Sequence, residues 1–112
     1  MRALRDLLLA LGLVGCGAAP MPGSIGVVAH REPTGRVVIV DVPAGEAGAR
    51  AGLEPGDEIL AIDGVEVKSL SKDDFHRSVR GPVGSHVSID VRRDGLRHRI
   101  VVERRVMREV AR

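Results

Sequence analysis

The sequence predicts a single α+β domain, built mainly from short antiparallel strands with one main helix and one short helix. Three observations predict this class. Most of the chain after residue 23 alternates apolar and polar residues with period two, which is typical of strands. Only residues 72–80 carry helix-start and helix-stop signals at both ends. The chain has 112 residues, a length that suits one domain.

Two strands are expected in the first half of the chain. Residues 24–30 form a short strand with period-two alternation. Residues 36–42 read RVVIVDV, with β-branched side chains on both faces. A strand of that composition is expected to be buried on both sides of a sheet.

Two Asp-Gly pairs predict hairpin turns, because this dipeptide adopts the positive φ angles of the tightest hairpin connection. The first pair, residues 63–64, joins a strand at 58–62 to a strand at 65–67. The second pair, residues 94–95, lies between two longer runs in which apolar residues alternate with polar ones. These runs predict the last hairpin of the sheet, each strand having one apolar face.

The main helix is expected over residues 72–80. Ser71 is placed as its N-cap and Asp74 as the acidic partner of a capping box. Gly81 is expected in the left-handed conformation just after the helix, and Pro82 prevents its continuation. The only aromatic residue of the chain, Phe75, is expected to turn from this helix into a core otherwise built from Val, Ile, Leu and Ala.

Residues 43–67 form the most distinctive motif, PAGEAGARAGLEPGDEILAIDGVEV. Small residues allow a very short helix to pack close to a sheet, and Gly52 ends that helix in the left-handed conformation. Pro55-Gly56 then makes a turn before the next strand. The motif therefore predicts a strand end, a short helix, a tight turn and a strand.

This motif strongly resembles the centre of bacterial PDZ domains, in particular those of C-terminal processing peptidases and high-temperature-requirement serine proteases. The resemblance covers residues 23–105 and includes SIGV at 24–27 and the short helix at 49–53. It implies a PDZ-like fold, a small and partly open antiparallel β-barrel capped by one main helix and one short helix. It also implies that a peptide binds between a strand and the main helix as an added strand.

The resemblance implies where the ligand binds, because residues of this sequence occupy the positions that bind peptide in the family. The amides of a loop before the first strand capture the peptide's terminal carboxylate, and helix spacing puts one face of residues 72–79 along the groove. On the strand, either residues 27 and 29 or residues 28 and 30 face the peptide, depending on register. The predicted peptide-binding residues are Ile25, Gly26, Val27, Val28, Ala29, His30, Lys72, His76 and Val79.

Two further features concern the ligand. No Lys or Arg occurs between Asp6 and Arg31, although many PDZ domains carry a basic residue shortly before the carboxylate loop. Internal extended segments are therefore an alternative to free C-termini. Lys72, His76 and Arg80 add positive charge along the helix side, which favours acidic peptides.

The N-terminus predicts an export signal that ends at a cysteine. Arg2 and Arg5 precede an apolar run at residues 7–15, which is shorter than the roughly 20 residues of a membrane-spanning helix and suits a signal peptide. LVGC, ending at Cys16, resembles the lipobox of bacterial lipoproteins, although Asp6 weakens the positive start. The alternative is a buried N-terminal helix with an incidental cysteine.

This interpretation divides the chain into four parts: a signal peptide at 1–15, a lipidated tether at 16–22, the PDZ domain at 23–105 and a basic tail at 106–112. It predicts a lipoprotein of the bacterial cell envelope, attached to the membrane through lipid on Cys16 and facing the periplasm. The expected partner is a peptide or protein C-terminus, with membrane proteins included.

Several other functions are disfavoured. The net charge is only +2 and the chain has one aromatic residue, a composition unlike that of nucleic-acid-binding surfaces. The sequence has no G-x-S-x-G motif, no H-x-x-x-H motif and no cysteine pair, so no catalytic residue, metal or cofactor is expected. The alternative to peptide capture is a structural docking subunit or adaptor of an envelope protease or secretion assembly.

Overall fold

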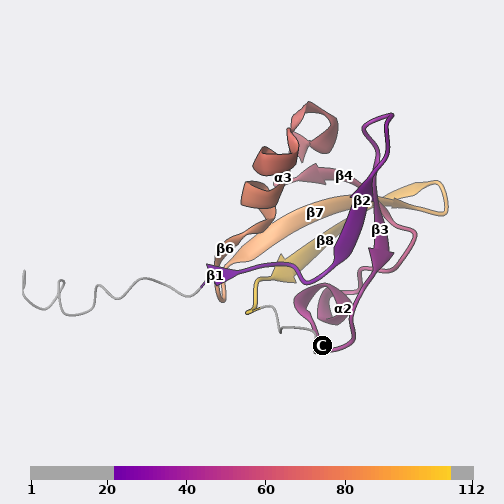
Figure 1. Ribbon diagram of the computed structural model, residues 1–112. Coiled ribbons are helices and arrows are strands. Elements are labelled where there is room, and N and C mark those ends of the chain that lie inside the picture. The colour runs from indigo at the N-terminus through magenta and orange to yellow at the C-terminus, as the bar shows by residue number, and fades with distance from the viewer. Residues whose placement is uncertain (1–21, 107–112) are drawn as a thin grey trace, which may run out of the picture.

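A computed structural model describes residues 22–106. The predicted signal peptide, the predicted lipidation site Cys16, most of the predicted tether and residues 107–112 of the predicted tail lie outside the described residues. Between these limits the chain folds as a strongly curved sheet with two helices packed against it (Figure 1).

The main sheet has the strand order β2-β3-β4-β7-β8, and every neighbouring pair is antiparallel. Its strands are β2 (Val28–Arg31), β3 (Val37–Asp41), β4 (Glu58–Ile62), β7 (His86–Arg93) and β8 (Leu96–Glu103). A short strand, β5 (Val65–Glu66), pairs with β4, and β1 (Pro22–Gly23) pairs separately with β6 (Gly81–Pro82). The helices are α2 (Ala47–Ala51), the 3₁₀ turn η1 (Val67–Ser69) and α3 (Lys72–Val79). This architecture confirms the predicted α+β class.

The core consists mainly of Ile and Val side chains from the sheet, with contributions from the loops and helices beside it. Ile39, Ile59, Ile89 and Val102 are fully buried, and β8, which carries Val102, packs against α2. Phe75, which was expected to turn fully into the core, is only partly buried and packs against its edge. One side of the Phe75 ring therefore stays at the molecular surface, where it lines two hollows.

Both Asp-Gly turns have the predicted geometry. The φ angles are 48° and 83° at Asp63 and Gly64, and 53° and 77° at Asp94 and Gly95. Positive φ at both central residues matches the right-handed twist of the flanking strands. The strand after the first turn is shorter than expected, because Val67 is buried and begins η1.

The prediction for Gly81 is wrong. This residue is not left-handed but extends the chain as β6, where it pairs with Gly23. A Cβ at position 81 would lie 2.8 Å from the guanidinium carbon of Arg104. Glycine is therefore required here by close packing against that side chain. At the end of α2, by contrast, Gly52 is left-handed with φ of 98°, as predicted.

Candidate peptide-binding groove

A groove runs between β2 and α3 and consists of two hollows that share Ala29, Phe75 and His76. In Figure 1, β2 crosses in front of β7 and β8, and α3 lies to one side of it. The strand has only β3 as a neighbour among the described residues, so its other edge carries unpaired backbone groups. The groove thus joins an open strand edge to a helix face.

The loop before β2 begins the groove. Residues 25–27 were expected to belong to the strand, but the strand starts only at Val28 because Gly26 is left-handed, with φ of 65°. Within residues 22–106, the amides of Ile25, Gly26 and Val27 make none of the loop and turn hydrogen bonds. Successive amides around one left-handed residue can converge on an anion.

Helix α2 fixes this loop from behind. A Cβ at Gly26 would lie 2.7 Å from the Cβ of Glu46, and a Cβ at Gly48 would lie 2.5 Å from Val27 and 2.8 Å from the Ile25 carbonyl oxygen. All three distances are too short for a side chain, so glycine at each position lets the short helix and the loop come into contact. Small residues were expected to let the short helix pack close to the sheet, and Gly48 allows the same close approach to the loop.

The hollow next to the loop is largely apolar. Its walls come from the loop, from the start of β2 and from the last turn of α3. The residues that line it are Ser24, Ile25, Val27, Ala29, Phe75, His76, Val79 and Arg80. An apolar side chain at the end of a ligand suits these walls, and Arg80 places one cation beside them.

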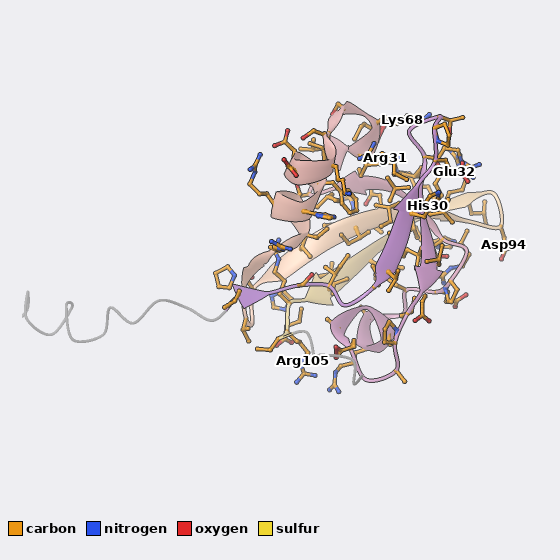
Figure 2. The ribbon with its side chains drawn as sticks, viewed as in Figure 1. His30, Arg31, Glu32, Lys68, Asp94 and Arg105 are labelled. Carbon is orange, nitrogen blue, oxygen red and sulfur yellow. The ribbon has the colours of Figure 1, made fainter. Side chains whose placement is uncertain are left out.

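The other hollow, of about 380 Å³, is cationic. Ala29, Val37 and Phe75 give it an apolar floor, and its walls are His30, Arg31, Lys72 and His76. Figure 2 shows His30 and Arg31 at the upper end of β2. No Asp or Glu among residues 22–106 lines either hollow.

Eight of the nine predicted peptide-binding residues lie in the loop or line the groove. Val27 and Ala29 point into it, which selects that register for the inner face of the strand. His30 also lines the outer hollow. Val28 lines neither hollow, and its side chain is 49% exposed on the opposite face. Sequence reasoning missed Arg31, which directly follows the predicted strand, and it placed Phe75 in the core instead of the groove wall.

Arg104 holds α3 in position and was also missed. Its guanidinium is buried and donates to the carbonyl oxygens of Ser78 and Val79, at 3.0 and 3.1 Å, and to the Ser85 hydroxyl at 3.0 Å. The last carbonyls of a helix lack partners within it and carry partial negative charge. A cation that directly follows β8 therefore caps the helix that forms one wall of the groove.

At its other end the same helix has the expected cap. The Ser71 hydroxyl accepts from the Asp74 amide at 3.1 Å, and the Asp74 carboxylate accepts from Arg77 at 2.6 Å. Hydrogen bonds from Arg77 and Ser71 hold the pKa of Asp74 below its usual value. Both ends of α3 are thus fixed by polar contacts that leave its groove face unobstructed.

The turn of the central motif is held by a buried ion pair. Asp57 accepts two hydrogen bonds from Arg93, at 2.8 and 2.7 Å, and one from the Glu54 amide at 2.9 Å. Burial by itself would raise the pKa of Asp57, but the bonds from Arg93 and the amide outweigh it and lower the pKa. Arg93 also donates to the Gly52 carbonyl oxygen, which ties the end of α2 to β7.

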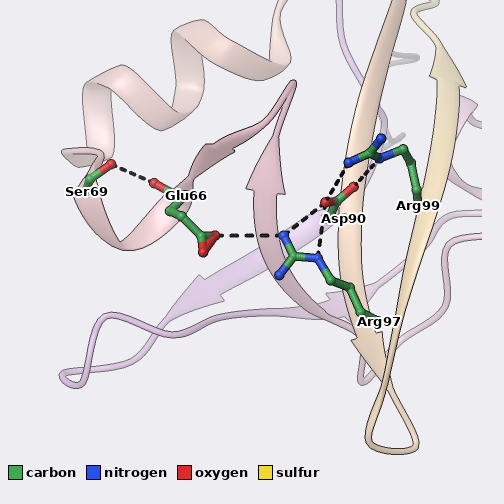
Figure 3. Close-up of polar contacts among 5 residues, drawn as sticks. All are labelled: Glu66, Ser69, Asp90, Arg97 and Arg99. Carbon is green, nitrogen blue, oxygen red and sulfur yellow. Dashed lines mark hydrogen bonds and ion pairs between the residues drawn. The ribbon is translucent and has the colours of Figure 1, made fainter.

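A second charged cluster lies away from the groove. Figure 3 shows Arg97 and Arg99 of β8 converging on the buried Asp90 of β7, with Glu66 on the far side of Arg97. The hydrogen bond from Arg99, reinforced by Arg97, lowers the pKa of Asp90 against the effect of burial. These charges neutralise one another and stabilise the pairing of β7 with β8.

Neither a metal cluster nor a membrane-spanning helix is found among the described residues. No group of three His, Cys, Asp or Glu side chains within residues 22–106 could hold a metal ion. Over the same residues, no helix has the length and apolar character needed to cross a bilayer.

Comparison with known proteins identifies this arrangement. Residues 38–93 match the family model of the PDZ domain. A carboxyl-terminal-processing protease of Synechocystis is 41% identical over 58 residues, which are 52% of this chain and 14% of that protein. Carboxyl-terminal-processing peptidase 2 of Arabidopsis thaliana is 42% identical over 60 residues, 54% of this chain and 12% of that protein. The chain thus spans a small fraction of each relative.

Solved structures agree with the fold. The PDZ domain of a carboxy-terminal protease from Vibrio cholerae, in complex with a peptide, superposes with a TM-score of 0.68 and 26% identity. That match covers 80% of this chain and all of the other. An HtrA-type protease with a decapeptide gives a TM-score of 0.70 and 25% identity, over 94% of this chain and 35% of that one. The chain belongs to the PDZ domain family.

Proposed function

We propose that this domain binds extended peptide segments, C-terminal tails foremost, as an added strand between β2 and α3. The observation that carries the proposal is the unpaired edge of β2, which runs directly from the loop with the left-handed Gly26. Backbone hydrogen bonds along the edge supply affinity, and the two hollows beside it select side chains. The peptide complexes of the Vibrio and HtrA-type relatives support this reading.

The loop would receive the terminal carboxylate. The amides of residues 25–27 are available in the described structure, and charge-assisted hydrogen bonds to a carboxylate are stronger than neutral ones. The apolar hollow beside the loop, with Ile25 and Val79 among its walls, would take the last side chain of the ligand. Arg80 lines the same hollow and adds the positive charge that the sequence before the loop lacks.

A comparison of two peptides tests this function. One peptide of about eight residues has a free carboxylate and an apolar last residue, and its twin differs only by a C-terminal amide. Fluorescence anisotropy should show clearly tighter binding of the free acid, since only it carries the charge that the loop amides favour. Equal binding of the two peptides would favour internal segments as ligands. No binding of either would favour a docking subunit or adaptor.

The proposal also includes the cellular setting, a non-catalytic lipoprotein of the bacterial envelope that faces the periplasm. It is supported by the arginines before the apolar run at 7–15 and by the LVGC sequence that ends at Cys16. Replacing Cys16 with Ser should abolish lipid attachment. Metabolic labelling with palmitate followed by fractionation checks this, and continued labelling of the variant would contradict it.

A further inference from the structure

A separate hollow of about 450 Å³ lies on the outer face of the sheet and shares no residue with the two hollows of the groove. Its size is within the roughly 300–1,000 Å³ of small-molecule sites. Part of its lining is apolar and comes from Ile59, Leu60 and Val67. The rest is mostly charged, from Arg36, Glu58, Glu66, Lys68, Arg92 and Arg97. We call this cavity the sheet hollow.

Strand pairing brings three of these charges into one row across the sheet. Glu58 of β4 lies directly opposite Arg92 of β7, and Arg92 lies directly opposite Arg97 of β8. Because Ile59 and Val91 next to them belong to the core, the row points to the outer face. Like charges directly opposite one another destabilise a sheet. The two arginines therefore have a cost that the fold alone does not explain.

The carboxylates beside these arginines satisfy them only in part. The buried Glu58 accepts at one oxygen from Arg92 Nη1, at 3.1 Å, and from Arg36 Nη2, at 3.5 Å. Asp90 accepts from Nε and Nη2 of Arg97 (Figure 3). Among the described residues, Nε and Nη2 of Arg92 and Nη1 of Arg97 have no partner. Both side chains are about half exposed, at 54% and 52%, so these donors can reach a ligand.

Lys68 adds a cation from a third element. It belongs to η1, lines the sheet hollow and is exposed. Its ammonium has no hydrogen bond or ion pair to any residue within 22–106. Spare donors from η1, β7 and β8 thus surround one cavity.

The charge of the lining indicates the chemistry of a ligand. Four cations and two carboxylates line the sheet hollow, an excess of two positive charges. Glu32 and Asp90 contact two of its arginines but do not line it. A phosphate monoester carries about −1.5 to −2 charge at pH 7 and has three strong acceptor oxygens. It therefore matches the excess charge and the spare donors better than a carboxylate, which has one charge and two oxygens.

We propose that the sheet hollow binds a phosphate monoester, with its organic part against Leu60 and Val67. Lys68, Arg92 and Arg97 bind the phosphoryl oxygens, and the buried Glu58 positions Arg92. The site is independent of peptide binding, because the groove has none of these residues in its walls.

Phenyl phosphate and phenyl sulfate form a matched pair of probes for this site. The two esters have the same shape, but only the phosphate, whose second pKa is about 6, is a dianion at about pH 7.5. Isothermal titration calorimetry at low salt should show at least about fivefold tighter binding of phenyl phosphate. Equal affinities, or no binding of either probe, would overturn the proposal.

Replacing Lys68 with Met should weaken the binding of phenyl phosphate at least about fivefold. The midpoint of urea unfolding should not change, since Lys68 has no partner within the described fold. Lys72→Met is the matched control, because it removes the same charge from a side chain that lines the peptide groove instead. The control should keep the parent affinity. Equal losses in both variants would mean that overall charge attracts the anion, and the site would be refuted.

Amide chemical shifts locate the bound anion without any substitution. During titration with phenyl phosphate, the largest changes should fall on residues 66–69 and 92–97. The peptide groove is also cationic, at His30, Arg31 and Lys72. Changes centred on residues 25–31 and 72–80 would place the anion there and refute the sheet hollow as its site.

Vesicles distinguish a soluble phosphate ester from a lipid headgroup. Phosphatidic acid presents a phosphate monoester, whereas phosphatidylglycerol presents a diester. Cosedimentation with the first lipid alone, lost in Lys68→Met, would support the site and identify a lipid as its ligand. Binding of phenyl phosphate without cosedimentation would support the site with a soluble ester. Equal cosedimentation with both lipids, unchanged in Lys68→Met, together with equal affinities for the two phenyl esters, would refute it.

Discussion

Gly26 shows how one residue determines the groove. The left-handed backbone at Gly26 delays the start of β2 to Val28, and the amides of residues 25–27 make none of the loop and turn hydrogen bonds among the described residues. Its missing side chain also lets the loop contact α2 at Glu46. Conformation and close packing therefore both require glycine, and only the first of these requirements can be read from the sequence pattern.

Replacing Gly26 with Ala should reduce both stability and peptide affinity. A left-handed alanine costs about 1 kcal/mol, and the clash with Glu46 must be relieved by movement of the loop. Gly45→Ala is the matched control, because Gly45 is also left-handed, with φ of 83°, but has nothing within 4 Å of the added methyl. Denaturant melts should show a loss in both variants, whereas titration should show weaker binding in Gly26→Ala alone. Equal affinities would contradict the role given to the loop.

Asp57 makes the stability of the domain dependent on pH. Its pKa in the folded state lies below the ordinary value of 3.8, to which it returns on unfolding. The ionised pair with Arg93 therefore contributes fully above about pH 4, and this contribution is lost as the pH falls through the lowered pKa. Asp90 behaves in the same way through Arg99 and Arg97.

In Asp57→Asn, the free energy of unfolding should therefore fall less steeply as the pH is lowered below about 4 than it does in the parent. At neutral pH the variant should lose about 1.5–3 kcal/mol, the usual contribution of hydrogen bonds to a charged group, because Arg93 is partly exposed and keeps its contacts with Glu54 and Gly52. The difference between variant and parent should shrink below pH 4. Urea melts from pH 2 to pH 7 measure this, with the exposed Asp73→Asn as control. A difference that is constant with pH would show that the pair adds no charge-dependent stability.

At the scale of elements, the two edges of the sheet differ in what they allow. β8 also lies at an edge, but its outward side chains include Arg97, Arg99 and Glu103, and charges of this kind discourage the addition of another strand. The open edge of β2, by contrast, faces the groove, and no acidic side chain of the described residues lines that groove. The side chains on each edge thus explain why a ligand is expected at β2.

Helix α3 depends on Arg104 for its position. Arg104→Met should cost about 3 kcal/mol, because it leaves the carbonyl groups of Ser78 and Val79 without their buried donor. Peptide affinity should fall as well, since Val79 belongs to the groove wall. Arg104→Lys should recover only part of the stability, because an ammonium cannot reproduce the guanidinium fork. Full recovery in thermal melts would mean that charge alone secures the helix.

At the scale of the whole molecule, the sequence predicts what local chemistry determines. Both Asp-Gly turns, the Ser71 cap and the end of α2 at Gly52 follow from rules that involve a few neighbouring residues. Gly81 and Phe75 were misplaced because their surroundings depend on distant segments: Arg104 packs on the first, and the open groove leaves one side of the second uncovered.

In the candidate site, too, the residues set by local sequence could be predicted and those set by distant contacts could not. Residues 25–30 and 72–79 could be proposed from a motif and from helix spacing. Arg31 could not, because it stands out only by its place in the groove wall and by one buried guanidinium nitrogen without a partner among the described residues, and both become known only when the strands are in place. Arg104 likewise lies 25 residues from the carbonyl of Val79 that it caps.

The domain enters and leaves its fold at one point. Ser24 and Arg105 exchange backbone hydrogen bonds at 3.0 and 3.2 Å, and Pro22 and Val106 line the same hollow beside Arg80. Residues 22–106 thus form an insertable unit on a single stem, which a surface turn of a host protein should accept without strain. Because Ser24 and Arg80 also line the hollow beside the loop at residues 25–27, whatever is joined at this stem stands next to the place where the proposed function puts the last residue of a ligand.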